Sequence, residues 1–176
     1  RAIEANDADP DVYRAIAQSF IAAQKYDRAA ELFKRAIALN PNDISSMGSL
    51  SLIQEKEGRP KEAEELLRKA LDLAPANPQL LKQLGSFYLR AGDRRKAAEL
   101  YTSVINTDRL DMPTWLALAQ LHFEDENKGA LDELEKLADD RLADMPEFYS
   151  QYGRLAQVFG VAGGEVACDA EQGEDA

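Results

Sequence analysis

The sequence predicts an all-α protein, a right-handed α-solenoid of stacked antiparallel helix hairpins. Three observations lead to this prediction. The chain of 176 residues is self-similar with a 34-residue period, apolar residues recur within each period at helical spacing, and small residues recur where two helices must approach closely. Because a hairpin of two helices cannot bury its apolar face alone, successive hairpins are expected to stack.

Composition limits the classes of function. The formal net charge is −11, with 45% hydrophobic and 30% charged residues, which is typical of a folded soluble chain rather than a disordered one. The acidic balance argues against nucleic acid or an anionic membrane as the main partner. The sequence has no run of about 18 apolar residues, which argues against direct membrane insertion. The single cysteine, Cys168, excludes an intrachain disulfide, and the single histidine, His122, excludes a His-rich metal cage. We therefore expect no metal or cofactor. The sequence does not indicate whether the protein is cytoplasmic or periplasmic.

Four series of residues in one 34-residue register define the repeat. The first holds bulky residues, namely Tyr13, Met47, Leu81, Trp115 and Tyr149. The second is apolar, at Ile16, Leu50, Leu84, Leu118 and Tyr152. The third is small, at Ala17, Ser51, Gly85, Ala119 and Gly153, and the fourth is alanine at Ala29, Ala63 and Ala97. Each period therefore reads as two helices whose small residues face each other at a close crossing.

The register assigns the elements in order along the chain. Residues 1–9 resemble the end of a truncated preceding repeat, so we expect the chain to be a fragment of a longer protein. Three repeats follow, at 10–43, 44–77 and 78–111. The turns inside the second and third contain Gly58 and Gly92. The cut N-terminal end is expected to leave apolar surface uncovered and to promote self-association.

The C-terminal part departs from the regular pattern. Residues 112–145 read as a degenerate fourth repeat, whose second helix is expected to follow a turn that has lost one residue. That shift would put Ala130, Leu134 and Leu137 on the packing face. Residues 146–160 are expected to form a capping helix. The segment 161–176 is rich in Gly, Ala and acidic residues and is expected to be a mobile tail.

These residues resemble the tetratricopeptide repeat family. The family pattern appears in the first repeat as Tyr13, Ile16, Ala17, Phe20, Ala29, Phe33, Ala36 and Pro41. In the second repeat Gln54 stands where an aromatic residue is usual, and in the third Arg109 replaces the closing proline. The resemblance implies that a peptide or partner helix binds on the concave face formed by the first helix of each repeat.

Mapping that face onto the chain gives the candidate binding residues. They are Arg14, Gln18, Gly48, Ser49, Leu52, Lys82, Gln83, Ser86, Arg90, Leu116, Gln120 and Phe123. Small residues leave room for another backbone, and glutamine amides can hydrogen-bond the ligand. Apolar contact is expected from Leu52, Leu116 and Phe123. Basic residues outnumber acidic ones on this face, which predicts a partner with acidic and apolar character. The alternative, that these are only exposed helix faces, stays open.

Residues suited to catalysis are scarce. His122 occupies a helix position that faces the partner helix, so we expect it to be packed, and Cys168 lies in the acidic tail with no basic neighbour to activate it. We therefore predict a protein interaction scaffold or adaptor and not an enzyme. The alternative is a regulatory or substrate-presenting segment. It would belong to a larger envelope assembly for secretion, pilus formation or polymer export, or to an enzyme whose catalytic domain lies upstream.

Overall fold

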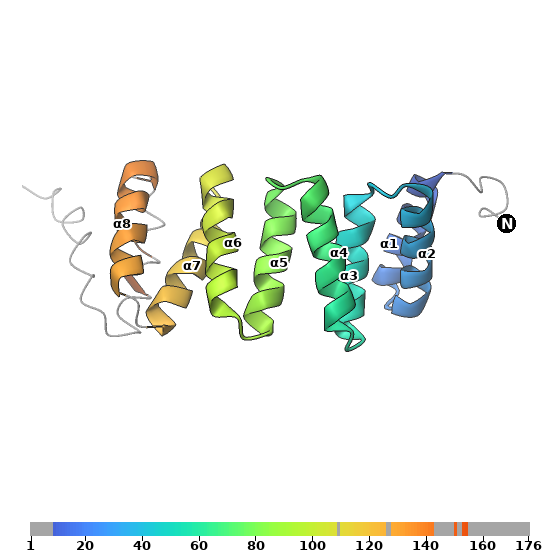
Figure 1. Cartoon of the computed structure of the whole chain (residues 1–176), viewed down its shortest axis with the longest axis horizontal. Coiled ribbons are helices and arrows are strands. Elements are labelled where there is room, and N and C mark those ends of the chain that lie inside the picture. The colour runs from blue at the N-terminus through green and yellow to red at the C-terminus, as the bar shows by residue number, and fades with distance from the viewer. Residues whose placement is uncertain (1–8, 109, 126–127, 143–149, 151–152, 155–176) are drawn as a thin grey trace, which may run out of the picture. The chain divides into compact units, whose positions relative to one another are not determined.

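The computed structural model describes residues 9–108, 110–125, 128–142, 150 and 153–154 (Figure 1). In this part of the chain the secondary structure is α-helical throughout and contains no strand, which confirms the all-α prediction. The helices are α1 (Pro10–Ala22), α2 (Tyr26–Leu39), α3 (Ile44–Lys56), α4 (Pro60–Leu73), α5 (Pro78–Arg90), α6 (Arg94–Thr107), α7 (Met112–Glu124) and α8 (Lys128–Leu142). Apart from Asp9, Ser150, Gly153 and Arg154, the expected truncated repeat end, capping helix and acidic tail lie outside the described residues.

The helices keep the period of the sequence throughout. The first helices α1, α3, α5 and α7 begin one full period apart, and so do the second helices α2, α4, α6 and α8. The expected loss of one residue in the turn before α8 involves residues 126–127, which lie outside the described residues, so it stays a prediction. Leu134 is buried as expected, whereas Ala130 and Leu137 are only half-buried. Leu131, which takes the register position of Ala97 in α6, is buried as well.

The turn inside each of the first three repeats uses one left-handed residue. Gln24, Gly58 and Gly92, which share one register position, have φ of 57°, 75° and 83°. This conformation lets the following N–H reach back to a carbonyl of the preceding helix, as from Lys25 to the oxygen of Phe20 at 2.9 Å. Glycine adopts it without steric cost, whereas Gln24 must accept a disfavoured backbone conformation.

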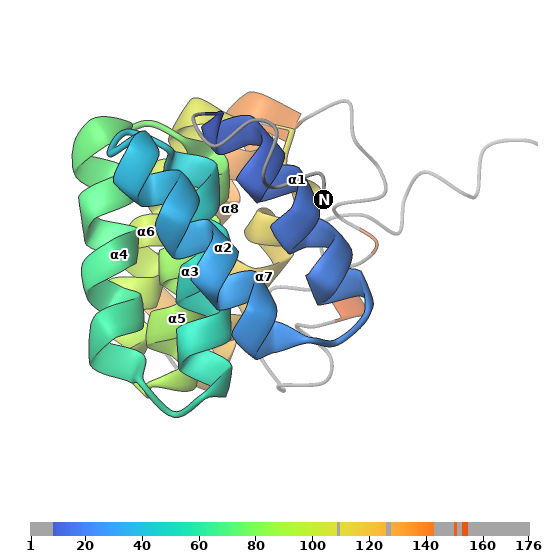
Figure 2. The ribbon, with the colours of Figure 1, turned by 90° about the vertical axis from the view of Figure 1, so that its right-hand side faces the viewer.

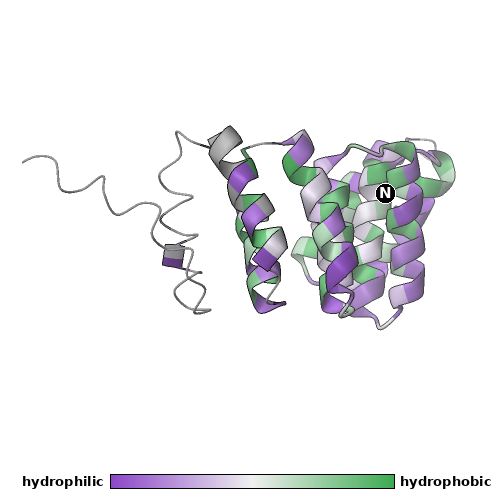
Figure 3. Ribbon diagram, turned by 60° about the vertical axis from the view of Figure 1, so that its left-hand side comes forward, coloured by the Kyte–Doolittle hydropathy of each residue, from purple (hydrophilic) through white to green (hydrophobic). Residues whose placement is uncertain are grey.

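The chain divides into two compact units, residues 1–87 (unit 1) and 88–176 (unit 2), with the boundary inside α5. In unit 1, α1 packs on α2, α2 on α3 and α3 on α4, and these helices lie side by side in two views (Figures 1 and 2). In unit 2, α6 packs on α7 and α7 packs on α8. The helices visible in Figure 3 carry both hydrophilic and hydrophobic residues, as expected for helices that bury one face.

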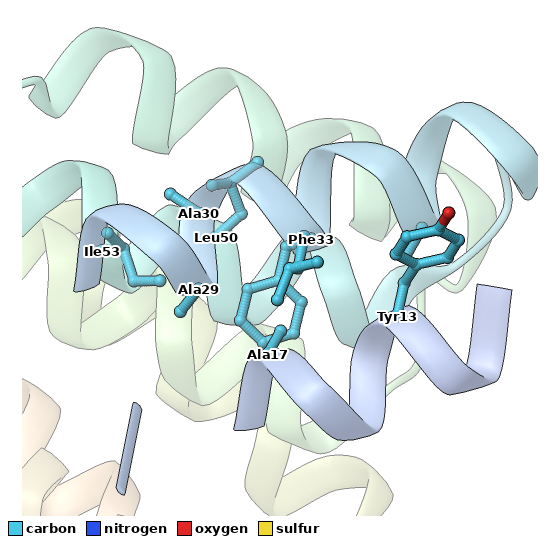
Figure 4. Packing of buried hydrophobic residues seen from close by; sticks show 9 residues of the cluster. Tyr13, Ala17, Ala29, Ala30, Phe33, Leu50 and Ile53 are labelled. Atoms are coloured by element: carbon cyan, nitrogen blue, oxygen red, sulfur yellow. The ribbon is translucent and has the colours of Figure 1, made fainter. Parts of the chain in front are cut away.

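The core of unit 1 forms where α1 crosses α2. Ala17 and Ala29 are both fully buried there, and Phe33 fills the space beside them (Figure 4). Leu50 and Ile53 from α3 belong to the same cluster, so the core continues from the first hairpin into the second. Small side chains at the crossing let the two helices approach closely, which is the arrangement that the sequence pattern predicts.

In unit 2, Arg94 at the start of α6 connects that helix to the end of α7. Its guanidinium donates to Glu124 and, from Nε, to Asp125 Oδ1 at 2.6 Å. Gln120 Nε2 also donates to Glu124, at 2.8 Å. The hydrogen bond from Arg94, followed by that from Gln120, lowers the pKa of the Glu124 carboxyl. The same ion pairs raise the pKa of Arg94, so both groups stay charged over a wide pH range.

We predict that Ala29→Leu destabilises the protein by about 1–3 kcal/mol, because the added volume forces α1 and α2 apart at their closest approach. Ala38→Leu is the matched control, since Ala38 lies exposed on the same helix and should change the free energy of unfolding by no more than about 0.5 kcal/mol. Urea denaturation midpoints measure both changes. Equal midpoints for the two variants would show that the crossing is not at Ala29.

We also predict that Arg94→Met lowers the free energy of unfolding by at most about 1 kcal/mol at pH 7, because the ion pairs are about one-third exposed. The folded protein holds the pKa of Glu124 below its ordinary value of 4.5, so this contribution is complete above that value. It is lost as the pH falls through the lower folded value. The difference in the free energy of unfolding between the wild type and Arg94→Met should therefore become smaller below about pH 4.5.

Arg95→Met is the control for this pH dependence. Arg95 is the neighbouring residue on α6, but its side chain is 83% exposed and its contact to Glu99 is 3.9 Å long. Thermal or urea unfolding between pH 3 and pH 7 should show no pH-dependent difference between this variant and the wild type. A constant difference across the range for Arg94→Met would contradict the assigned role of Glu124.

Candidate interaction surface

In unit 1 the predicted binding residues come from α1, α3 and the first turns of α5. Gly48, Ser49 and Leu52 share one side of α3, because residues three and four apart are neighbours on a helix surface. Leu52 is 41% exposed, whereas Gly48 is buried and Ser49 half-buried. The remaining members are Gln18, which is exposed, and Arg14, Lys82, Gln83 and Ser86, which are half-buried.

Gly48 and Gln83 are in direct contact in the structure. A Cβ atom built on Gly48 would lie 2.7 Å from Oε1 of Gln83, closer than real Cβ atoms approach another atom. The space above Gly48, which the sequence pattern assigned to the backbone of a ligand, is therefore filled by the amide of Gln83. The oxygen of this amide is buried and has no hydrogen-bond partner among the described residues.

Arg14 is held by two carboxylates. Its Nη2 lies 2.8 Å from Asp11 Oδ1, and its Nη1 lies 3.3 Å from both oxygens of Asp43. Asp43 is buried at the start of α3, where it also accepts hydrogen bonds from the backbone N–H and the hydroxyl of Ser46. Arg14 therefore connects α1 to the N-terminus of α3, rather than being a free cation available to a ligand as the sequence pattern implied.

Asp43 is the functional neighbour that sequence reasoning missed. An Asp directly before a helix, with Ser46 three residues later, is a recognisable N-cap signal. That signal identifies the cap but does not show that the same carboxylate reaches Arg14 on another helix. The long-range pairing becomes visible only when the two hairpins are packed together.

The charges on this side of unit 1 balance. Arg14, Lys56 and Lys82 are matched in number by Asp11, Asp43 and Glu55. Lys56 Nζ lies 4.5 Å from the ring centroid of Tyr26 and donates to its hydroxyl at 3.2 Å. Lys82 is not a free cation either. The predicted basic excess also counts Arg90, which is exposed and belongs to unit 2, so the acidic character of the partner stays a prediction.

In unit 2 the predicted residues are Arg90, Leu116, Gln120 and Phe123. Phe123 is only 2% exposed, so the prediction that it offers apolar contact to a ligand is wrong. It lies near the end of α7, where its side chain packs inside the protein. Leu116 is half-buried, whereas Arg90 and Gln120 are exposed, and Gln120 is engaged with Glu124. Arg90 is not a free cation.

The described part of the chain contains neither of two other classes of site. No group of three or more His, Cys, Asp or Glu side chains there is arranged to hold a metal ion. None of the described helices combines the length and the apolar character that crossing a membrane requires.

Two models of the tetratricopeptide repeat match the chain, at residues 14–78 and 55–121. Among curated relatives, anaphase-promoting complex subunit 3 of Schizosaccharomyces pombe is 26% identical over 80% of this chain and 22% of its own length. BBSome complex member BBS4 of Bos taurus is 26% identical over 68% of this chain and 23% of its own length. The chain thus spans less than a quarter of these relatives.

Solved structures show the same fold. A crystal structure of MamA superimposes with a TM-score of 0.67 at 16% identity, covering 86% of this chain and 83% of that one. YrrB, described as a TPR protein with an unusual peptide-binding site, gives a TM-score of 0.67 at 17% identity. The match covers 93% of this chain and 84% of YrrB. The 34-residue register, the alanine crossings, the matching family models and these structures agree, and the chain belongs to the tetratricopeptide repeat family.

Proposed function

We propose that the exposed side of α3 in unit 1, centred on Leu52, binds a peptide segment of a partner protein. A tetratricopeptide repeat chain is a protein interaction scaffold, and the proposal names the surface that this chain uses. The proposed site is limited to unit 1, because α1, α3 and the first part of α5 all belong to that compact unit.

The observation that carries the proposal is the exposure of Leu52. Within unit 1 two other leucines are exposed, Leu39 and Leu73, and both lie at the C-terminal ends of the second helices α2 and α4. The remaining exposed leucines, Leu89 at the end of α5 and Leu110 before α7, belong to unit 2. Leu52 instead lies within a first helix, one turn after Gly48 and near the small residue Ser49. The space above Gly48 is taken by Gln83, but an exposed aliphatic side chain beside the small Ser49 gives a partner side chain an apolar contact and room to approach.

The balance of charge suggests an uncharged ligand segment. Arg14 is paired with Asp11 and Asp43, and the charge of Lys56 is matched in number by the neighbouring Glu55, so this side of unit 1 has little net positive charge to steer an acidic peptide. We therefore replace the expected acidic partner by a neutral segment with an aliphatic anchor. Gln18, exposed on α1, can hydrogen-bond the backbone or a polar side chain of such a segment.

A second candidate role is supported by the relatives. Two of them are named as subunits of assemblies, the anaphase-promoting complex and the BBSome, and this chain covers less than a quarter of each. The chain would then be one segment of a larger protein that holds a neighbouring subunit. The same surface on α3 serves either role, because both require recognition of another protein.

The test uses a random dodecapeptide library displayed on phage and selected on the full chain. We predict that Leu52→Ala weakens binding of the selected peptides by roughly fivefold or more, since loss of a buried aliphatic contact costs about 1 kcal/mol or more. Binding should fall similarly at low and high salt, because the contact is apolar. Fluorescence polarisation with the synthesised peptides measures the dissociation constants.

Leu73→Ala is the matched control. Leu73 is 44% exposed against 41% for Leu52, but it lies at the end of α4. This variant should bind the selected peptides with wild-type affinity. If both variants bind equally well, the peptides use another surface and the assignment to α3 is wrong.

A further inference from the structure

The amide of Gln83 is held against α3 in an arrangement that leaves one atom unsatisfied. Its Oε1 lies over Gly48, and the absence of a side chain at position 48 is what admits it, since a Cβ there would be 2.7 Å away. Both Cδ and Nε2 lie farther from that point, at 3.6 Å. The oxygen is therefore the atom that enters the notch above Gly48.

A buried carbonyl oxygen without a donor is unfavourable. Leaving such an acceptor unpaired costs the free energy of removing it from water, whereas a hydrogen bond to an N–H group recovers it. The last torsion of a glutamine side chain is soft, so the amide can turn without moving its aliphatic stem. Gln83 is thus an acceptor placed beside α3 that lacks a donor within the described part of the chain.

We propose that Gln83 accepts a hydrogen bond from a backbone N–H of the peptide that binds along α3, and that Gly48 is the notch that positions its amide. This inference rests on the proposed function and adds the chemical group of the ligand that the site recognises, a backbone N–H. Gly48 and Leu52 are one helical turn apart, roughly 6 Å. An extended peptide covers that distance in about two residues.

The recognised ligand is therefore an uncharged, extended segment with two features at fixed spacing. An aliphatic side chain contacts Leu52, and a free backbone N–H about two residues away reaches Oε1 of Gln83. A backbone donor satisfies the amide whatever the side chain at that ligand position. Specificity then comes from the aliphatic anchor, whereas Gln83 requires that the backbone nitrogen carry a hydrogen.

The experiment is a thermodynamic cycle on the full chain. The probe is a phage-selected dodecapeptide whose binding is sensitive to Leu52→Ala, synthesised with each backbone nitrogen methylated in turn. Methylation at the recognised nitrogen should weaken binding to the wild type about three- to tenfold, as expected for one hydrogen bond. Gln83→Leu should weaken binding of the unmethylated peptide by a similar factor, and methylation of that nitrogen should then have no further effect.

Gln79→Leu is the matched control, because Gln79 lies one turn earlier on α5 and is exposed. It should leave the penalty for methylation unchanged. Gly48→Ala is a second test, since the added methyl group drives the amide out of its notch and should reduce that penalty. Thermal unfolding of each variant confirms that the fold is retained.

The outcomes separate the two proposals. An equal methylation penalty in the wild type and in Gln83→Leu, with sensitivity to Leu52→Ala preserved, overturns the role of Gln83 and leaves the surface on α3 standing. If no selected peptide distinguishes Leu52→Ala from the wild type, the proposed surface itself is wrong and the role of Gln83 falls with it.

Discussion

The close crossing of two helices at small residues is the constraint on which the rest of the structure depends. Ala17 and Ala29 have no exposed surface, and the approach they permit brings Phe33 into the core with Leu50 and Ile53 of the next hairpin. A larger residue at the crossing would separate the helices and open a gap that the neighbouring aromatic side chain could not fill. The periodic recurrence of small residues therefore determines the helix pairing and the faces left outside.

The sequence was sufficient to predict the hairpins because periodic burial is a local signal. Every helix from α1 to α7 begins in the 34-residue register. For the turn before α8, part of which lies outside the described residues, the sequence pattern suggests the loss of one residue. That inference preferred Ala130 to Leu131 at the crossing, because the other repeats hold alanine there. In the structure Leu131 and Leu134 are buried and Ala130 is half-buried.

The candidate site was harder to predict, because exposure and pairing depend on packing between helices. Phe123 was assigned to the surface from its register position, yet it is buried near the end of α7. Arg14 was counted as an available charge, yet Asp43 reaches it from the start of α3. Gly48 was interpreted as open space, yet Gln83 of α5 fills it. The last two contacts join different helix hairpins, so no pattern within one repeat could reveal them.

Two buried glutamine oxygens in unit 1 have no hydrogen-bond partner among the described residues. One of them lies at a position where the repeat pattern favours an aromatic residue. Gln54 stands where Phe20 and Tyr88 occupy the same register position, and its side-chain oxygen is buried without a partner among the described residues. An aromatic residue there would bury more apolar surface and leave no acceptor unsatisfied. The core of unit 1 is therefore less stable than its own pattern allows. Gln83 has the same deficit but lies beside the exposed side of α3, where an incoming backbone can correct it. An acceptor without a hydrogen bond deep in a hairpin only lowers the stability of the fold. Beside a binding surface, the same acceptor favours a ligand that brings a hydrogen-bond donor.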